Sequence, residues 1–411
     1  MAVSFQLTSE QEQLKIAARQ FADVHLRPLA DAVRSEPDPL RRALLARPAF
    51  ENAVASGFLK GLIPVPFGGA AAGGIEACIL IEEWACHSPG FVIALAGPLI
   101  ALAPVYEAGT PEQIERFVAP FLAGHGAPVA AMAFSEPEGT ANFDAPPPAE
   151  GLRTTAVPDG DSWVINGRKA WASHLAGWDG DGPEVMTIVC RTPGGISLVA
   201  AEREHLAGHI EVEEHYDLAG LRGCLPSRVR LHDVRVPRSN LLGAEGQGAV
   251  LTRNAFWASG ASIGIFAVAA MRQAFDVAYR YAVAEKRGGA VPIIGHQSVA
   301  DVLADAKGRI EAARLLSWRA LDAVIAQDPA GPELALHAKI FGSETGTDVI
   351  TRLLGVVGVQ SCDSEFPLAR YLADALAYPV IEGSNTGIRR RQLQNLFQTP
   401  GYDPLTASGM S

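Results

Sequence analysis

A single carboxylate near the end of the chain stands in a pattern suited to proton transfer. Glu382 follows Pro379 and two aliphatic residues, and Gly383 comes directly after it. An apolar lead-in favours a partly desolvated carboxylate, which is a stronger base than one in water, and a glycine lets a flat ligand approach the backbone. The alternative is an ordinary acidic residue before a helix that Ser384 or Asn385 caps, followed by three solvated arginines. Composition alone favours this second interpretation.

The bulk composition excludes several classes of function. The chain has 411 residues, 48% of them hydrophobic, so it can bury a core large enough to be stable without disulfide bonds. Its formal net charge of −11 argues against a nucleic-acid binder, which needs a basic surface. No run approaches about eighteen uninterrupted apolar residues, and the N-terminal residues lack the regions of a secretory signal. We therefore expect no membrane span and no secretion.

Five scattered cysteines form no recognisable motif. Neither a CxxC pair nor a Cys/His cluster appears, so the sequence predicts no disulfide framework and no metal site. Each cysteine is most simply a small buried residue, and a reducing, cytoplasmic location is expected. The five are Cys78, Cys86, Cys190, Cys224 and Cys362.

The sequence divides into three successive regions with different secondary-structure patterns. Residues 1–130 read as a helical domain, 131–240 as a β-domain, 241–400 as a helical bundle, and 401–411 as a tail. In the first domain we expect a capping box that begins at Ser9, and a kinked or short helix where Pro98 and Pro104 interrupt an apolar run. Short β-rich runs separated by turns predict a compact barrel or sandwich in the second. These runs are 163–165, 185–190, 196–200, 210–212 and 229–231.

Four further stretches carry residues able to hold a ligand, and each also has a plain structural interpretation. Residues 133–142 read AFSEPEGTAN, which is otherwise a β-turn rich in small residues. Trp171 is otherwise a core residue of a strand, and Ser259 could simply ease helix packing. Arg287 would be a solvated charge at a helix end in most proteins.

Taken with the α, β, α order, these stretches resemble the acyl-CoA dehydrogenase superfamily of flavoproteins over nearly the whole chain, and within it the nitroalkane oxidases. The resemblance implies an FAD-dependent oxidoreductase with an N-terminal helical domain, a central β-domain and a C-terminal four-helix bundle. FAD would lie between the β-domain and the bundle. Because one copy would contact the FAD of another, a homotetramer is expected.

The resemblance also implies roles for particular residues. Glu382 would remove an acidic α-proton while flavin N5 accepts the electrons, with Arg389 as its charge partner and Ser259 nearby. Trp171 would stack near the isoalloxazine, and Arg287 would reach the pyrophosphate of a neighbouring subunit's FAD. The implied cofactor contacts are Phe134, Ser135, Gly139, Thr140, Trp171, Ser173, Arg287, Gln297, Gly355, Gly358, Ser384 and Thr386. No role falls to His174, which is expected to be structural or exposed at an edge.

Departures from the common superfamily pattern bear on the substrate. Residues 139–142 read GTAN where most members have Gly-Ser-Asp, and residues 287–289 read RGG. Both variants resemble nitroalkane oxidases, whereas Glu382 is the base of acyl-CoA dehydrogenases in a position where nitroalkane oxidases have Asp. We prefer a nitroalkane-oxidase-like oxidase, with dehydrogenation of an acyl thioester, on CoA or a carrier protein, as the alternative. A catalytically idle FAD-binding protein is disfavoured by the intact Glu382-Gly383 pair.

Overall fold

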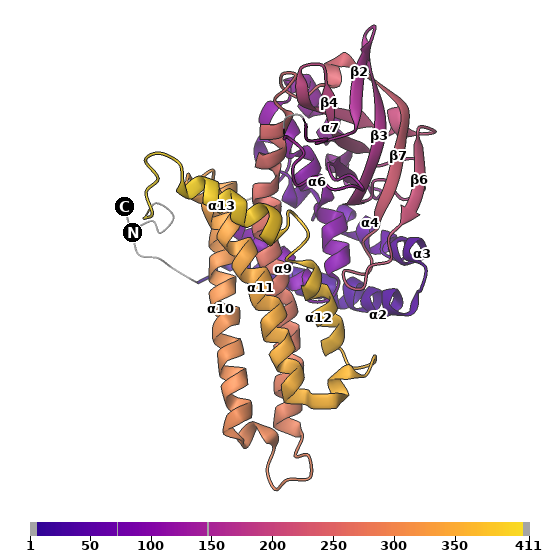
Figure 1. Ribbon diagram of the computed structural model, residues 1–411. Coiled ribbons are helices and arrows are strands. Elements are labelled where there is room, and N and C mark those ends of the chain that lie inside the picture. Colours follow the sequence, from indigo (N-terminus) through magenta and orange to yellow (C-terminus); the bar gives the residue numbers. More distant parts are fainter. Residues whose placement is uncertain (1–5, 72, 146–147, 406–411) are drawn as a thin grey trace.

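A computed structural model describes residues 6–71, 73–145 and 148–405, so residues 406–411 of the expected tail lie outside the described part. Helices at both ends of the chain surround a central sheet (Figure 1), which confirms the predicted fold class. The N-terminal helices pack against one edge of the sheet and against the upper part of the bundle. They are α1 (Ser9–Phe21), α2 (Arg27–Ser35), α3 (Pro39–Leu44), α4 (Arg47–Ala55), α5 (Gly74–Ala85), α6 (Pro89–Ala108) and α7 (Pro111–Leu122).

Two local expectations in this region need a correction. The capping box lies one residue earlier than Ser9: the Gln11 N–H donates to the Thr8 hydroxyl, and the Thr8 N–H donates to the Gln11 side chain. Of the two alternatives for α6, a kinked or a short helix, the short one is wrong, because α6 runs through 20 residues with Pro98 and Pro104 inside it. Burial of half of its most apolar window helps to offset the backbone hydrogen bonds that the two prolines remove.

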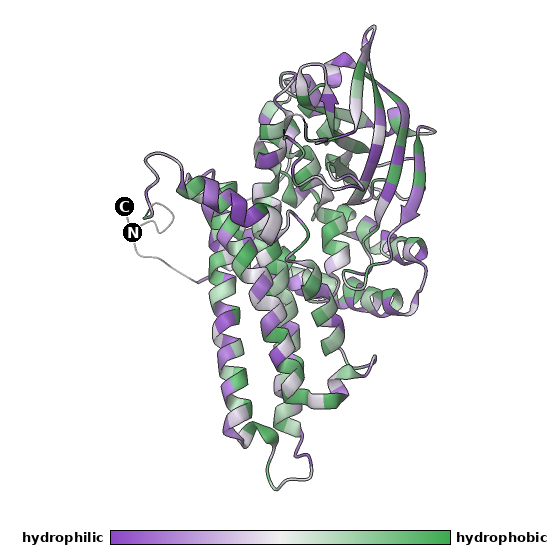
Figure 2. Cartoon of the chain, in the orientation of Figure 1, coloured by the Kyte–Doolittle hydropathy of each residue, from purple (hydrophilic) through white to green (hydrophobic). Residues whose placement is uncertain are grey.

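The strands form one seven-stranded sheet. Its order is β1-β4-β2-β3-β7-β6, and β5 pairs with β4. The pairs β1–β4 and β2–β4 are parallel, while the others are antiparallel. Polar and apolar residues alternate along β7, which buries one face and exposes the other (Figure 2). The strands are β1 (Ala130–Ala133), β2 (Thr155–Asp159), β3 (Ser162–Ser173), β4 (Val185–Thr192), β5 (Gly195–Glu202), β6 (Ile210–His215) and β7 (Pro226–Pro237).

Three long helices form most of the bundle, α9 (Gly248–Ala284), α10 (Gln297–Ile325) and α11 (Gly331–Val357). The short helix α12 (Leu368–Ala377) packs beside α9 and α11 as the fourth member, a place that we expected the segment after Ser384 to fill. That segment instead forms a π-helical turn (Asn385–Arg389) and helix α13 (Arg390–Phe397), which lies across the end of the bundle nearest the sheet (Figure 1).

Helices α6 and α9 are long and apolar enough to cross a membrane by length and composition alone. Half of the most apolar window of α6, and 67% of that of α9, is buried inside the fold. Core helices of globular proteins have the same properties, so this finding is weak support for a membrane span.

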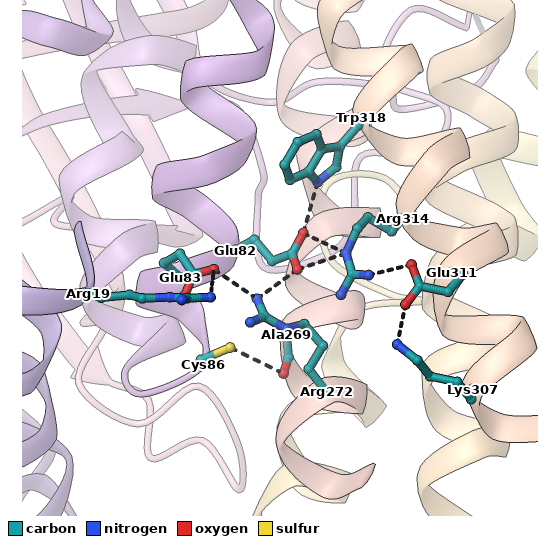
Figure 3. Close-up of polar contacts among 10 residues, drawn as sticks. All are labelled: Arg19, Glu82, Glu83, Cys86, Ala269, Arg272, Lys307, Glu311, Arg314 and Trp318. Carbon is teal, nitrogen blue, oxygen red and sulfur yellow. Dashed lines mark hydrogen bonds and ion pairs between the residues drawn. The ribbon is translucent and has the colours of Figure 1, made fainter. Parts of the chain in front are cut away.

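A charged network joins the N-terminal helices to the bundle (Figure 3). Glu82 and Glu83 are adjacent buried residues of α5. Arg272 of α9 donates to both carboxylates, Arg314 of α10 donates to Glu82, and Arg19 of α1 donates to Glu83 at 2.9 Å. Because buried carboxylates are costly unless they are paired, these arginines hold α5 between α1 and the bundle.

Candidate active site

Glu382 lies in a tight turn between α12 and the π-helical turn. The Asn385 N–H donates to the Pro379 carbonyl at 2.9 Å, which closes this stretch, and we call residues 378–385 the base turn. Glu382 has φ +50° and Gly383 has φ +80°. The left-handed region is unfavourable for a glutamate. A side chain held there against its local preference indicates a functional constraint.

Arg389 is fully buried and holds the base turn through its backbone. Its Nε donates to the Glu382 carbonyl oxygen at 3.0 Å, and Nη2 donates to the same oxygen. A Cβ on Gly383 would lie 2.9 Å from Nε, so the guanidinium needs a glycine there. Burial lowers the pKa of Arg389 to about 10, and the charge of Glu382 opposes that shift.

The expected contact between Arg389 and the base therefore needs a correction. Within the described residues no ion pair joins the guanidinium to the Glu382 carboxylate; the guanidinium contacts the carbonyl instead. Arg389 therefore holds the backbone of Glu382, and its charge acts on the carboxylate only from a distance.

Ten buried side-chain polar atoms of the described residues have no hydrogen-bond partner, and Oε2 of Glu382 and Oγ of Ser259 are the two in these segments. Buried polar atoms in native proteins usually have partners, so these two oxygens are free to bond to a ligand. Ser259 precedes Gly260 in α9, and a Cβ on Gly260 would lie 3.2 Å from Nη2 of Arg389. The two orphaned oxygens therefore belong to segments that meet at the same guanidinium.

Aromatic contacts bring the segment after β1 to the same place. The Phe256 carbonyl accepts from Arg389 at 3.4 Å, and its ring lies 5.8 Å from the guanidinium carbon. The ring centroid of Phe134 lies 5.6 Å from that of Phe256, in an edge-on arrangement. Three predicted site segments, those of Phe134, Ser259 and Glu382, thus converge in one chain.

The loop that carries Gly139 and Thr140 is tied to the last helix. Arg391 of α13 donates to the Asn142 side chain at 3.0 Å and to the Ala141 carbonyl at 2.6 Å. Gly139 has φ +96°, which a glycine adopts without strain. This contact places the predicted flavin loop against the segment that begins at the base turn.

The two other predicted site residues near the C-terminus, Ser384 and Thr386, have different surroundings. The Ser384 hydroxyl accepts from the Gly387 N–H at 3.1 Å, which confirms that Ser384 caps the segment after the base. Thr386 is exposed at the outer side of this turn. Asn385 is buried, and its contacts are with α11.

A buried ion pair supports the predicted flavin segment, and sequence reasoning missed it. Lys169 of β3 donates to the Phe134 carbonyl at 3.1 Å, to Oε1 of Glu136 at 3.1 Å and to the Val189 carbonyl at 2.8 Å. Burial lowers the pKa of Lys169, and the charge of Glu136 opposes that shift. The only signal in the sequence is a lysine at an inward position of a strand.

Trp171 and Ser173 lie at the end of β3. The Ala170 N–H donates to the Ser135 carbonyl at 2.9 Å, which joins this strand end to the flavin segment. The Trp171 ring stacks on Tyr216 with centroids 3.9 Å apart and an interplanar angle of 5°. Trp171 is 54% exposed, so within one chain it is not the water-excluding wall that we expected. It offers a flat, accessible aromatic face instead.

His174 is buried, so the edge-exposed alternative for this residue is wrong. Burial lowers its pKa to about 4, and its ring lies 4.5 Å from that of Trp178. A neutral histidine inside an apolar environment fits the structural role.

The other predicted cofactor residues gather at the opposite end of the bundle. Arg287 follows α9, and a Cβ on Gly358 would lie 2.9 Å from its Nη2. Gln297 begins α10 beside them, and Gly355 lies in the last turn of α11. At 1.5 Å per residue, α9 extends about 38 Å from Ser259 to its end. The predicted contacts therefore form two separate groups in one chain.

Two other places in the described residues look like sites but have their own partners. Glu202, Glu204 and His205 could surround a cation, yet the His205 ring already accepts from the Glu202 N–H in a helix cap. A groove of about 500 Å³ lies between α1 and the bundle, and each of its six cationic side chains already has a carboxylate partner.

Known proteins of similar sequence cover this whole arrangement. The families described as acyl-CoA dehydrogenase N-terminal domain and C-terminal domain match residues 8–125 and 246–396. The nitroalkane oxidase of Podospora anserina is 37% identical, with 98% of each chain covered. The chain belongs to the acyl-CoA dehydrogenase superfamily. A mouse mitochondrial short-chain acyl-CoA dehydrogenase is a weaker relative, 27% identical over 93% of this chain and 89% of its own.

Solved structures of nitroalkane oxidases are similar to this chain over its whole length. A nitroalkane oxidase crystallised with 1-nitrooctane as an active-site Asp-to-Asn variant has a TM-score of 0.95 and 31% identity, and both chains are covered completely. A second structure of the same kind is described by the roles of one Asp and one Arg in its reaction, and these two lie seven residues apart. Glu382 and Arg389 have the same spacing.

As a member of this superfamily the chain is a flavin-dependent oxidoreductase that uses FAD. The residues present fit this cofactor. Two unpartnered buried oxygens face a ligand surface beside Phe134 and the flavin loop. The Trp171–Tyr216 pair provides a flat aromatic face, and the exposed guanidinium of Arg287 suits a pyrophosphate.

Proposed function

We propose that the chain oxidises small nitroalkanes, with dioxygen as the final electron acceptor. The observation that carries this proposal is the buried, unpartnered Oε2 of Glu382, beside the Arg389 guanidinium and the segment that holds the free Ser259 hydroxyl. A carbon that carries a nitro group is acidic, so one positioned carboxylate is enough to remove its proton. FAD, when it is bound, would supply the oxidising chemistry by taking up the electron pair of the resulting carbanion.

Each residue of the site has a part in this proton transfer. Glu382 takes the α-proton at its unpartnered oxygen. Arg389 fixes the backbone of the base through its hydrogen bonds to the Glu382 carbonyl. The hydroxyl of Ser259 remains free to donate to a substrate oxygen. Burial of the site keeps water away from the carbanion.

Dehydrogenation of an acyl thioester is the second candidate. It is favoured by one observation, the glutamate at position 382 where the related nitroalkane oxidase structures have an aspartate. The longer side chain would let the carboxylate reach the α-carbon of a thioester, whose β-hydrogen then leaves as hydride.

Anaerobic mixing of the flavoprotein with nitroethane and, separately, with butyryl-CoA distinguishes the two candidates. We expect nitroethane to bleach the flavin absorbance, and we expect hydrogen peroxide to form when air is admitted. Bleaching by the thioester alone would establish the second candidate. The Glu382→Gln variant should keep its flavin and lose about 10²–10⁴-fold in the rate of reduction by the true substrate.

The two separated groups of cofactor residues support a homotetramer, or at least a dimer. They lie farther apart than one FAD molecule reaches, so we infer that Arg287 of one copy serves the FAD of another. An Arg287→Ala variant should then release FAD on dilution while its Glu382 region remains folded, and light scattering should report the mass of a tetramer for the native protein. A cytoplasmic location is proposed as well, because all five cysteines are free thiols.

A further inference from the structure

A lysine inside the bundle contacts both ends of the base turn. Lys339 of α11 is completely buried. Its Nζ donates to the Tyr378 carbonyl at 2.7 Å and to Oδ1 of Asn385 at 2.9 Å. Tyr378 is the first residue of the base turn and Asn385 is the last. One ammonium group therefore bridges the two residues between which Glu382 is held.

The second anchor, Asn385, is itself held by α11. Its Nδ2 donates to the Ser343 hydroxyl at 3.0 Å and to Oε1 of Glu344 at 3.1 Å. The Ser343 hydroxyl donates to the Lys339 carbonyl at 2.6 Å. The amide orientation of Asn385 is thereby set, because its oxygen must face the ammonium and its nitrogen the two acceptors.

The charges around Lys339 do not include a carboxylate in contact with it. Glu382 and Glu344 act on it from a distance and favour its charged form, while Arg389 opposes that form. Glu344 is itself paired with Arg390 of α13. The segments of α9 against α11 contribute apolar residues and glycines, such as Gly264 against Gly342. Burial lowers the pKa of Lys339 to about 7.

We propose that Lys339 is a positioning residue for the base: it holds both ends of the turn that carries Glu382. This inference rests on the proposed role of Glu382 as the base.

The Lys339→Met variant tests the proposal. For neutral nitroethane we expect kcat/KM to fall on the order of 100-fold, since a displacement of about 1 Å in a reacting group has that effect. Turnover of the preformed ethyl nitronate anion, which needs no base, should stay within about twofold of the native rate.

A readout without substrate keeps this test separate from the proposed function. Hydrogen exchange of the peptide that covers residues 378–389 should accelerate in Lys339→Met. The matched control is Lys307→Met, which removes an exposed lysine of α10 paired with Glu311 and should leave both readouts unchanged. If no nitroalkane is oxidised at all, the exchange result still tests the positioning, while the substrate assay tests the function.

Two further variants make every outcome decisive. Asn385→Ala removes one of the two anchors, so it should also accelerate exchange in the base turn. Lys339→Gln keeps a hydrogen-bond donor, so it should retain part of the exchange protection that Lys339→Met loses. Native exchange and a native ratio of nitroethane turnover to nitronate turnover in folded, flavin-loaded Lys339→Met would overturn the proposal. Failure of both Lys339 variants to fold would assign the lysine a purely structural role and would overturn it as well.

Discussion

Two lysines with no exposed surface support the two halves of the site, and they differ in their partners. Lys169 lies under the flavin segment and contacts the Glu136 carboxylate directly, at 3.1 Å. Lys339 lies under the base turn and contacts only a carbonyl and an amide oxygen. Both donate to the backbone of the segment that they support, yet only the first has a counter-charge within hydrogen-bond distance.

The two lysines therefore differ in what stabilises their positive charge. The Glu136 carboxylate accepts from the Arg153 and Thr154 N–H groups and from the Thr154 hydroxyl, so the pair with Lys169 is fully satisfied. Burial opposes the charge on Glu136, but Lys169 and these donors hold the pKa of Glu136 below its usual value. Lys339 has no such partner, so its charge depends on the more distant Glu382. The lysine on the flavin side therefore has a contacting counter-charge, whereas the lysine on the base side has none.

The largest effect is expected on the flavin side. Lys169→Met leaves the Glu136 carboxylate buried without its counter-charge, which costs about 3–5 kcal/mol. We expect a clear fall in the unfolding temperature and in the flavin content of the purified protein. Calorimetry and the ratio of flavin to protein absorbance measure both.

The double variant Lys169→Met with Glu136→Gln is the matched control for this prediction. It removes both charges and keeps an acceptor for the Thr154 N–H. A substantial part of the lost stability should return, because no unpaired charge remains. If the double variant is no more stable than Lys169→Met, the pair does not act as a charge pair and the comparison with Lys339 fails.

The smaller effect on the base side should depend on pH. The folded chain releases the Lys339 proton near pH 7, whereas an unfolded chain keeps it to about 10.5. Between these values the unfolded state holds more protons, so the contribution of Lys339 to stability is lowest below pH 7 and rises as the pH rises. Lys339→Met lacks this rise.

The stability difference between native protein and Lys339→Met should therefore widen with pH. An increase of about 2 kcal/mol between pH 7 and pH 9 corresponds to the separation of the two pKa values over that range. Unfolding temperatures across this range measure it, with Lys307→Met as the control that should run parallel to the native protein. A difference that stays constant with pH would mean that Lys339 keeps its proton throughout this range.

The order of the domains could be predicted from the sequence, because helices and strands leave local periodicities. Glu382 became the candidate base only through the resemblance to a known superfamily, since its local pattern alone favoured an ordinary acidic residue. Helical and strand periodicities gave five of the seven strands. They missed β1, whose four residues include no β-branched or aromatic side chain, and β2, which contains Pro158. The capping box was displaced by one residue because Thr8 and Ser9 are both good N-caps.

The supports of the site could not be read from the sequence. Lys169 contacts a carbonyl 35 residues away and Lys339 one 39 residues away, and these acceptors are backbone atoms that every residue has. A buried lysine in a strand or a helix interrupts the apolar pattern, but the sequence does not show which group it contacts. Arg389 contacts the Glu382 carbonyl instead of the carboxylate, and this acceptor too is a backbone atom that no residue type identifies.

The smallest change is Glu382→Asp, which removes one methylene. It tests whether the surrounding residues hold Glu382 at a positive φ that a glutamate disfavours. Aspartate tolerates the left-handed region better than glutamate does, so Glu382→Asp should raise stability by about 0.5 kcal/mol if Lys339 and Arg389 impose the φ of +50°. The shorter side chain also withdraws the carboxylate from the position that the native turn gives it, so kcat/KM for nitroethane should fall about tenfold. A rise in stability together with a fall in kcat/KM would show that the native turn places a glutamate, and not an aspartate, for catalysis. A gain in both would instead show that the turn suits an aspartate, as in the related oxidases, and that the native glutamate serves a different substrate.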